Sequence, residues 1–195
     1  MKQAKQEIRR PSIEQLDEEI RRRKIVREYR RAIFGAIRAL VIFAAAAVLL
    51  STIWFPVMQV QKSSMTPTLH DGEALIFFKT DKVKKGEIVA FHNNNQILIK
   101  RVIAVSGEMV DIDPDGLVFI NGVRLEEPYL AGASLGECDI GLPCLVPAGE
   151  FFVMGDNRTL SLDSRNSGIG TVSQNQVAGK ALFRIWPLPR LGFIR

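Results

Sequence analysis

Hydrophobic residues follow two different patterns along this chain, one continuous and one interrupted. Residues 39–58 are apolar except for Ser51 and Thr52, and no charged side chain occurs between Arg38 and Lys62. At about 1.5 Å of rise per residue, a helix of about 20 residues spans the roughly 30 Å hydrocarbon core of a bilayer. The first pattern therefore predicts one transmembrane helix over residues 39–58.

The second pattern begins at residue 59 and consists of short apolar runs separated by turn sequences such as Asn121-Gly122. The runs expected to be strands are 74–78, 87–91, 97–105, 109–112, 117–120, 151–154 and 181–185. Many short strands at close spacing predict an all-β, partly closed barrel-like domain over residues 59–195. The expected fold class is therefore mainly β, with one N-terminal transmembrane helix.

Charged residues are divided unequally between the two sides of the predicted helix. Residues 1–38 hold 12 Lys and Arg against 6 Asp and Glu, and the rest hold 14 against 15, so the net charge of +5 divides into +6 and −1. The positive-inside rule then predicts a cytoplasmic basic segment at 1–38 and an extracytoplasmic domain on the plasma membrane. The basic segment is also expected to contact anionic membrane lipid, and it requires no nucleic acid partner.

A cleaved signal peptide is the alternative interpretation of the apolar segment. A 38-residue n-region is too long for a signal peptide, and the small residues 44–47 lie inside the apolar stretch, not after it. We therefore expect the helix to be retained as a single-pass anchor.

Two cysteines, Cys138 and Cys144, are separated by a five-residue spacer that contains Gly and Pro. In an oxidising extracytoplasmic setting this spacing can close a small disulfide loop, and two free buried thiols are the alternative. His70 and His92 are the only histidines, and neither lies at metal-ligand spacing from a cysteine. No metal site is expected.

Candidate chemistry appears first in two segments. Ser64 lies in the hydroxyl-rich segment 63–69, and Lys100 interrupts the apolar run 97–105. Strand alternation places Lys100 on the same face as Leu98 and Val102, and desolvation there would lower its pKa towards 7 or 8. Such a lysine can act as general base for a serine nucleophile. Taken singly, Ser64 could be a turn hydroxyl and Lys100 a strand-edge lysine that extends into solvent.

A third segment, 155–165, follows the predicted strand 151–154 and is rich in hydroxyls, carboxylates and guanidinium groups. Asp163 and Arg165 could pair to fix this loop, and Ser161 could hydrogen-bond a neutral lysine amine. A solvated polar loop is the alternative.

In order along the chain, the segments 63–69, 85–91, 99–107 and 155–165 resemble the conserved boxes of bacterial type I signal peptidases, which are membrane-bound serine proteases that use a Ser-Lys dyad. With the preceding anchor, the resemblance covers about residues 39–186. It implies an endopeptidase that removes N-terminal signal peptides from exported preproteins through an acyl-enzyme intermediate, without metal or other cofactor. Signal peptides and membrane lipid are the implied partners, and the secretion translocon is a further candidate.

The resemblance also implies roles for individual residues. Ser64 falls on the nucleophile and Lys100 on the general base, with Ser161 orienting the lysine and Asp163 and Arg165 forming a structural ion pair. The residues that match the floor of the site are Gly155, Asp156 and Asn157. The residues expected to contact an extended substrate are Val60, Gln61, Met65, Leu69, Leu98 and Ile99.

Two features depart from the family pattern. Many members have serine or glycine two residues before the nucleophile, where a serine side chain helps to form the oxyanion hole, and this chain has Lys62. The backbone N–H of Ser64 remains available as a donor, and the contribution of Lys62 is open. Residues 110–149, where some members carry a large second β-domain, are expected to form only a small β-extension that contains the cysteine loop.

Three other functions compete with this interpretation. His70 and Asp71 suggest a Ser-His-Asp triad, but their adjacency does not create triad geometry. A self-cleaving repressor-type protease would need a DNA-binding segment and no anchor. A catalytically inactive membrane-anchored β-domain could bind exported chains, with Lys62 as a sign of a degraded site.

Overall fold

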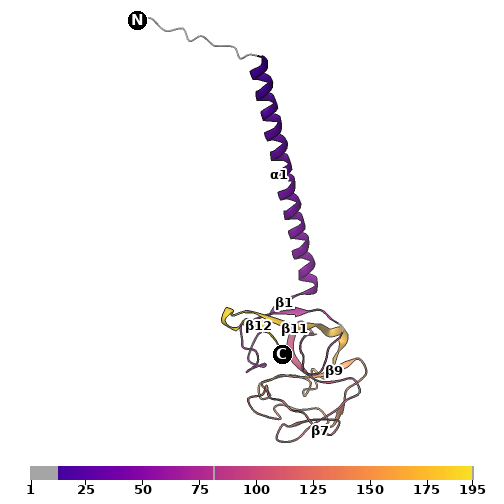
Figure 1. Ribbon diagram of the computed structural model, residues 1–195. Coiled ribbons are helices and arrows are strands. Elements are labelled where there is room, and N and C mark those ends of the chain that lie inside the picture. The colour runs from indigo at the N-terminus through magenta and orange to yellow at the C-terminus, as the bar shows by residue number, and fades with distance from the viewer. Residues whose placement is uncertain (1–12, 81, 195) are drawn as a thin grey trace. The chain divides into compact units, whose positions relative to one another are not determined.

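The computed structural model describes residues 13–80 and 82–194, and Figure 1 shows one long helix and a β-rich part. The chain divides into two units at Leu50 and Ser51, and each is described by itself. The helix, α1, runs over Ile13–Trp54 without interruption. Within it, Leu16–Leu49 is long and apolar enough to cross a membrane, by length and composition.

Helix α1 ends at Trp54, before the predicted boundary at residue 58. Phe55 donates the last helical hydrogen bond, to the Ser51 carbonyl at 2.8 Å, and Pro56 has no N–H with which to continue the series. The residues that follow turn instead into the first strand, where Val57 pairs with Ile76. The first twelve residues of the predicted basic segment lie outside the described residues.

Twelve strands follow α1 in the described part of the chain, and all of their pairings are antiparallel. They are β1 (Val57–Gln59), β2 (Ala74–Phe78), β3 (Ile88–Asn93), β4 (Gln96–Val105), β5 (Met109–Ile112), β6 (Val118–Ile120), β7 (Val123–Arg124), β8 (Cys144–Leu145), β9 (Glu150–Met154), β10 (Val172–Ser173), β11 (Val177–Trp186) and β12 (Gly192–Phe193).

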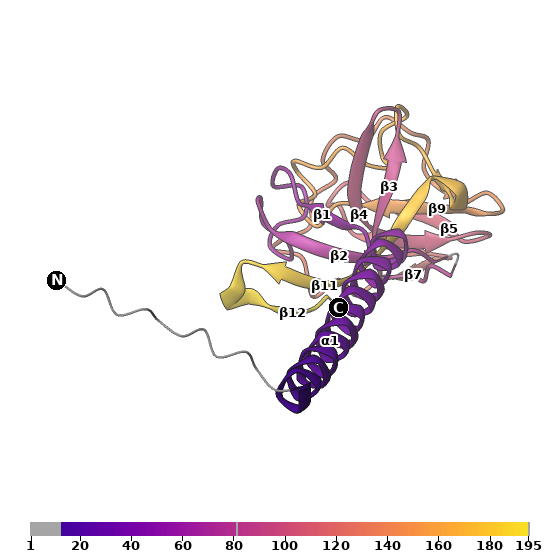
Figure 2. The ribbon, with the colours of Figure 1, turned by 90° about the horizontal axis from the view of Figure 1, so that it is seen from above.

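The strands form two sheets. The larger has the order β1-β2-β11-β3-β4-β9-β10, with β12 also paired to β11, and the smaller has the order β7-β6-β5-β8. In Figure 2, β1 and β2 can be followed side by side, as can β3 and β4. Strands β1 and β10 are the two ends of the larger sheet and do not pair with each other in the described residues. The mainly β prediction is therefore confirmed, but the barrel is not closed.

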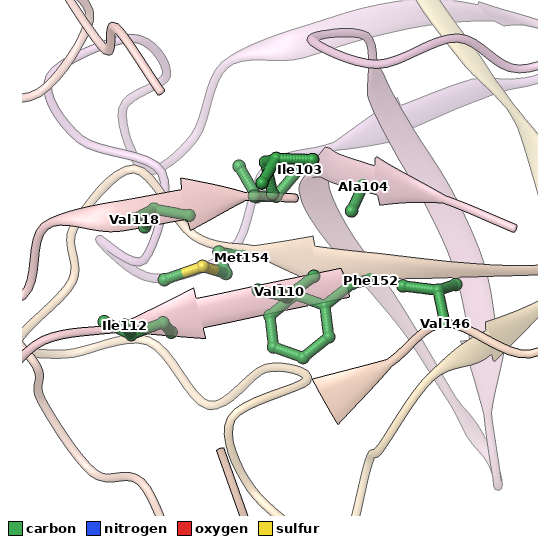
Figure 3. Close-up of a cluster of buried hydrophobic side chains, with 9 residues drawn as sticks. Ile103, Ala104, Val110, Ile112, Val118, Val146, Phe152 and Met154 are labelled. Carbon is green, nitrogen blue, oxygen red and sulfur yellow. The ribbon is translucent and has the colours of Figure 1, made fainter. Parts of the chain in front are cut away.

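A shared hydrophobic cluster joins the two sheets. Ile103 and Ala104 of β4 and Met154 of β9 pack with Val110 of β5 and Val118 of β6, and Figure 3 shows these side chains converging between the strands. The smaller sheet, built from residues 109–145, thereby shares its core with the strand that carries Lys100. This packing fixes the extension as part of the domain.

Candidate active site

Ser64 and Lys100 are direct neighbours. The Nζ atom of Lys100, in β4, lies 2.8 Å from the Oγ atom of Ser64, in the loop between β1 and β2. The two residues are 36 positions apart, so the contact depends on the sheet and not on local sequence. The predicted pair is brought together at hydrogen-bonding distance.

The loop that carries Ser64 is held by hydrogen bonds within the loop and by hydrogen bonds from the loop after β9. Thr66 donates its hydroxyl to the Ser63 carbonyl at 2.8 Å, and Leu69 donates its N–H to the Met65 carbonyl at 2.8 Å. Asn157 adds two hydrogen bonds from another loop, one from its N–H to the Ser64 carbonyl at 3.0 Å and one from its side-chain amide to Thr66 Oγ1 at 3.0 Å. Ser64 is therefore positioned by backbone contacts as well as by its contact with Lys100.

The Lys100 side chain is buried, and this burial lowers its pKa. Its side chain is 3% exposed, and Leu98 and Val102 pack in the same cluster as Val89, the residue opposite Lys100 in the strand register. This burial lowers the pKa of Lys100 from 10.5 to about 8, opposed by the nearby carboxylates of Asp163 and Asp156. About a tenth of Lys100 is then neutral at pH 7, and strand alternation predicted the correct environment.

The loop after β9 forms a buried ion pair beneath the dyad. The Arg165 guanidinium donates two hydrogen bonds to the Asp163 carboxylate, each 2.8 Å long, and both side chains are fully buried. The Gly155 N–H donates to the same carboxylate at 2.9 Å. Asp163 and Arg165 therefore pair as predicted.

Gly155 lies where no side chain fits. A Cβ atom at this position would lie 2.5 Å from the Ser64 carbonyl oxygen and would also collide with the Ser161 side chain. Glycine lets the loop approach the nucleophile backbone this closely. This close approach is a physical reason for glycine at position 155.

Arg101 and Asp156 form a second buried ion pair, which the sequence analysis did not identify. Arg101 Nε and Nη2 donate to the two Asp156 oxygens at 2.9 and 2.7 Å, and Arg101 Nη1 donates to the Gly86 carbonyl at 2.8 Å. Strand alternation over residues 97–105 predicts that Arg101 shares a face with Ile99 and Ile103. An arginine in a buried strand requires a carboxylate partner, and that requirement was the available signal.

The alternative Ser-His-Asp triad is not assembled. His70 Nδ1 lies 2.9 Å from Arg190 Nη1, and the Asp71 carboxylate accepts the Lys62 N–H at 2.7 Å. The Ser64 Oγ atom contacts Lys100 Nζ instead, at 2.8 Å. Within residues 13–80 and 82–194, no group of three or more His, Cys, Asp or Glu side chains is arranged to hold a metal ion.

Comparison with known proteins places this site in a family. The sequence matches the family described as signal peptidase, peptidase S26, over residues 33–186, which is most of the chain. The chain belongs to this family. Membership, together with relatives named signal peptidase I, makes the protein a serine endopeptidase.

Two relatives and one solved structure illustrate the similarity. Signal peptidase I of Bacillus licheniformis is 36% identical over 171 residues, covering 81% of this chain and 91% of that protein. Signal peptidase I T of Bacillus subtilis is 39% identical over 165 residues, covering 77% and 83%. A crystal structure of a signal peptidase I from Enterococcus faecalis aligns with 51% of this chain and 96% of its own, at 35% identity and a TM-score of 0.44.

Ser161 lies at the site of this S26 peptidase, and its role as the residue that orients Lys100 stays a prediction. Its Oγ atom is buried and has no hydrogen-bond partner in the described part of the chain. It is one of the atoms that a Gly155 side chain would meet, so it belongs to the same packed floor. A hydroxyl without a partner there can still accept or donate a hydrogen bond during the reaction.

Lys62 has an unusual backbone conformation for a lysine. Its φ angle is 66°, in the left-handed region that favours glycine, and its side chain is exposed. The Asp71 carboxylate holds the Lys62 N–H. Glycine at this position would have a conformational reason, and among the described residues no hydrogen bond or ion pair holds the Lys62 side chain over Ser64.

The residues predicted to contact substrate divide into two groups. Val60, Met65 and Leu69 are at most 2% exposed and belong to one hydrophobic cluster, so they lie in the core. Gln61 is exposed, and Leu98 and Ile99 are half-buried. In this structure the second group is the accessible one.

The two cysteines are free thiols in the structure. Cys144 lies in β8 and Cys138 in the loop before it, and both are half-buried. The disulfide stays a prediction.

Proposed function

We propose that this serine endopeptidase removes N-terminal signal peptides from exported preproteins, with Ser64 as nucleophile and Lys100 as general base. The observation that carries the proposal is the 2.8 Å contact between Ser64 Oγ and the Nζ atom of a buried lysine. The family membership supports the substrate class, since the relatives are named signal peptidases.

In the acylation step, the Ser64 hydroxyl gives its proton to neutral Lys100 as Oγ attacks the scissile carbonyl carbon. The resulting tetrahedral intermediate collapses when the Lys100 ammonium protonates the leaving amine. The mature protein then departs, and the signal peptide remains as an ester on Ser64. A pKa of about 8 for Lys100 suits both its proton acceptance and its proton return.

The backbone N–H of Ser64 is the proposed oxyanion donor. It donates to no acceptor among the described residues, so it is available for the developing negative charge. The exposed Lys62 ammonium is an open second contributor, and its charge already acts on Lys100 by lowering the pKa of that lysine. Deacylation repeats the chemistry, with Lys100 accepting a proton from the water that attacks the ester.

An unpaired strand edge supports binding of an extended peptide. Strand β4 pairs with β9 only from Arg101 onwards, so one edge of residues 96–99 has no strand partner in the described structure. A substrate can add there as a further strand, with its backbone hydrogen-bonded to β4 beside Gln61, Leu98 and Ile99. This arrangement brings a peptide bond to Ser64, and shallow apolar surface next to it suits small side chains.

The membrane placement follows from charge and helix length. We propose that α1 anchors the enzyme with the N-terminus in the cytoplasm and residues 59–195 on the extracytoplasmic face of the plasma membrane. The basic segment before the anchor would contact anionic lipid. The secretion translocon is a further proposed partner.

Cleavage of a preprotein by the full chain in detergent tests the proposed function. We expect one cut at the end of the signal peptide, identified by sequencing the new N-terminus of the product. The matched control is a preprotein with a bulky side chain directly before the cut, which small subsites should reject. A cut at unrelated positions in both substrates would contradict the proposal.

A further inference from the structure

The extension at residues 110–149 supplies binding partners to three buried arginines around the active site. These are Arg101, next to Lys100 in β4, and Arg158 and Arg165, which flank the floor of the site. Each has its other partners within the catalytic part of the domain. The contacts from the extension therefore complete the surroundings of all three.

Arg158 takes its counter-ion from the extension. It is 2% exposed, its Nε donates to the Gly155 carbonyl at 3.3 Å, and its Nη2 forms an ion pair with the buried Glu127 carboxylate. The Tyr129 hydroxyl donates to the same carboxylate at 2.7 Å. A buried guanidinium without such a partner would be strongly unfavourable, so Glu127 fixes Arg158 and, through it, the Gly155 carbonyl.

Tyr129 also contacts the second arginine. The Arg101 guanidinium carbon lies 3.9 Å from the centre of the Tyr129 ring, over its face. A cation over an aromatic face is attracted by the ring quadrupole, and the attraction increases when the pair is desolvated. Arg101 is thus held by Asp156 from the floor and by Tyr129 from the extension.

Arg165 is the third buried arginine that the extension contacts. Its Nη1 donates to the Leu135 carbonyl at 2.6 Å, and its other nitrogens bind Asp163 and the Ser161 carbonyl. The extension approaches so closely at Gly136 that a Cβ atom there would lie 2.7 Å from Arg165 Nη1. The contact is therefore built into the backbone of the extension.

We propose that Glu127 and Tyr129 are positioning residues for the peptidase reaction: they hold Arg158 and Arg101, and through them the floor of the site and the Arg101–Asp156 pair beside Lys100. This inference rests on the proposed function of the Ser64–Lys100 site. The extension then holds the arginines around Ser64 and Lys100 in place, and neither Glu127 nor Tyr129 contacts substrate.

These contacts from Glu127 and Tyr129 predict that their loss changes the pH profile of the reaction as well as its rate. Asp156 raises the pKa of Lys100, and Arg101 partly neutralises Asp156. If Arg101 loosens, the Asp156 charge acts more strongly, so the pKa of Lys100 rises and the acidic limb of the kcat/KM profile moves to higher pH. The position of this limb does not depend on how much of the enzyme is folded.

The test uses the full chain in detergent, with Tyr129→Leu and Glu127→Gln as variants, Tyr129→Phe as the ring-preserving variant and Glu126→Gln as matched control, because Glu126 is the exposed neighbour. We expect Tyr129→Leu and Glu127→Gln to lower kcat by about 10- to 100-fold, as small misplacements in an active site do, with KM changed much less. Tyr129→Leu should also move the acidic limb of the kcat/KM profile to higher pH. In Tyr129→Phe, which keeps the ring, this limb should stay at the wild-type position.

Two outcomes would overturn the inference. One is that Tyr129→Leu and Glu127→Gln match Glu126→Gln in kcat. The other is a lower kcat in Tyr129→Leu with an acidic limb at the wild-type position, which indicates only a loss of folded enzyme. If the wild type itself cleaves no preprotein, the proposed function fails instead, so the two failures are distinguishable.

Discussion

The backbone N–H of Asn157 donates a 3.0 Å hydrogen bond to the carbonyl oxygen of Ser64. This hydrogen bond joins the loop after β9 to the loop that carries Ser64, across more than 90 residues of sequence. It explains why Gly155, two residues earlier, must lack a side chain, and why a hydroxyl-rich loop far along the chain belongs to the same site as Ser64.

The activity of the enzyme should depend on the neutral form of Lys100. Because burial lowers its pKa to about 8, kcat/KM should fall about tenfold per pH unit well below that value and level off above it. A pH profile of preprotein cleavage measures this. A limb governed by a group that titrates near pH 6.5 would instead point to a histidine base.

Removing the Asp163 charge should lower the free energy of unfolding and move the pH profile of activity to lower pH. Asp163→Asn leaves the buried Arg165 unpaired, so we expect a loss of about 3–5 kcal/mol in the free energy of unfolding. Because Asp163 raises the pKa of Lys100, the acidic limb of the surviving activity should move to lower pH. Denaturant unfolding and a pH profile measure the two effects, with the exposed Asp115→Asn as control; a limb that moves upwards would contradict the assigned electrostatics.

A methyl group at position 155 should disrupt the nucleophile loop. In Gly155→Ala the added Cβ would meet the Ser64 carbonyl at 2.5 Å, and overpacking of this kind costs about 1–3 kcal/mol. We expect a lower melting temperature and a lower kcat. Gly141→Ala is the matched control, since nothing lies within 4 Å of a Cβ atom there, and equal effects of the two variants would contradict the packing argument.

Lys62→Gly should stabilise the fold and separate the two possible contributions of Lys62. Glycine adopts a φ of 66° without the cost that a lysine meets, so we expect a gain of about 1 kcal/mol. Removing the cation should raise the pKa of Lys100 and move the acidic limb slightly upwards. If the Ser64 N–H is the main oxyanion donor, kcat at high pH should stay near the wild-type value; a fall of about 10²-fold would instead identify the Lys62 ammonium as a donor.

The sequence predicted several strands and the contact between Ser64 and Lys100 because each has a strong local signal. The ten-residue β11 was predicted only over residues 181–185. Residues 74–78 and 109–112 alternate clearly and form β2 and β5 with the predicted bounds. Lys100 was recognisable because a lysine in an apolar strand must be desolvated. Strands of two or three residues, such as β1, β7 and β8, have no such period and exist only through pairing.

Long-range contacts are what the sequence could not predict. Arg101 was placed on an apolar face because alternation gives the direction of a side chain and not its partner, and Asp156 lies 55 residues away. Met65 and Leu69 follow Ser64 in the sequence, but they are buried in the core and anchor the loop there. The contacts that Arg101, Arg158 and Arg165 receive from the extension likewise depend on tertiary packing.

The most direct test of the Ser64–Lys100 dyad compares Ser64→Ala, Lys100→Ala and Ser63→Ala in preprotein cleavage by the full chain, with folding checked by thermal unfolding. Ser63 is the matched control because it is a neighbouring serine whose backbone carbonyl, and not its hydroxyl, holds Thr66. We predict that Ser64→Ala and Lys100→Ala lose cleavage while folded and that Ser63→Ala retains it. Full activity of folded Ser64→Ala or Lys100→Ala would contradict the account.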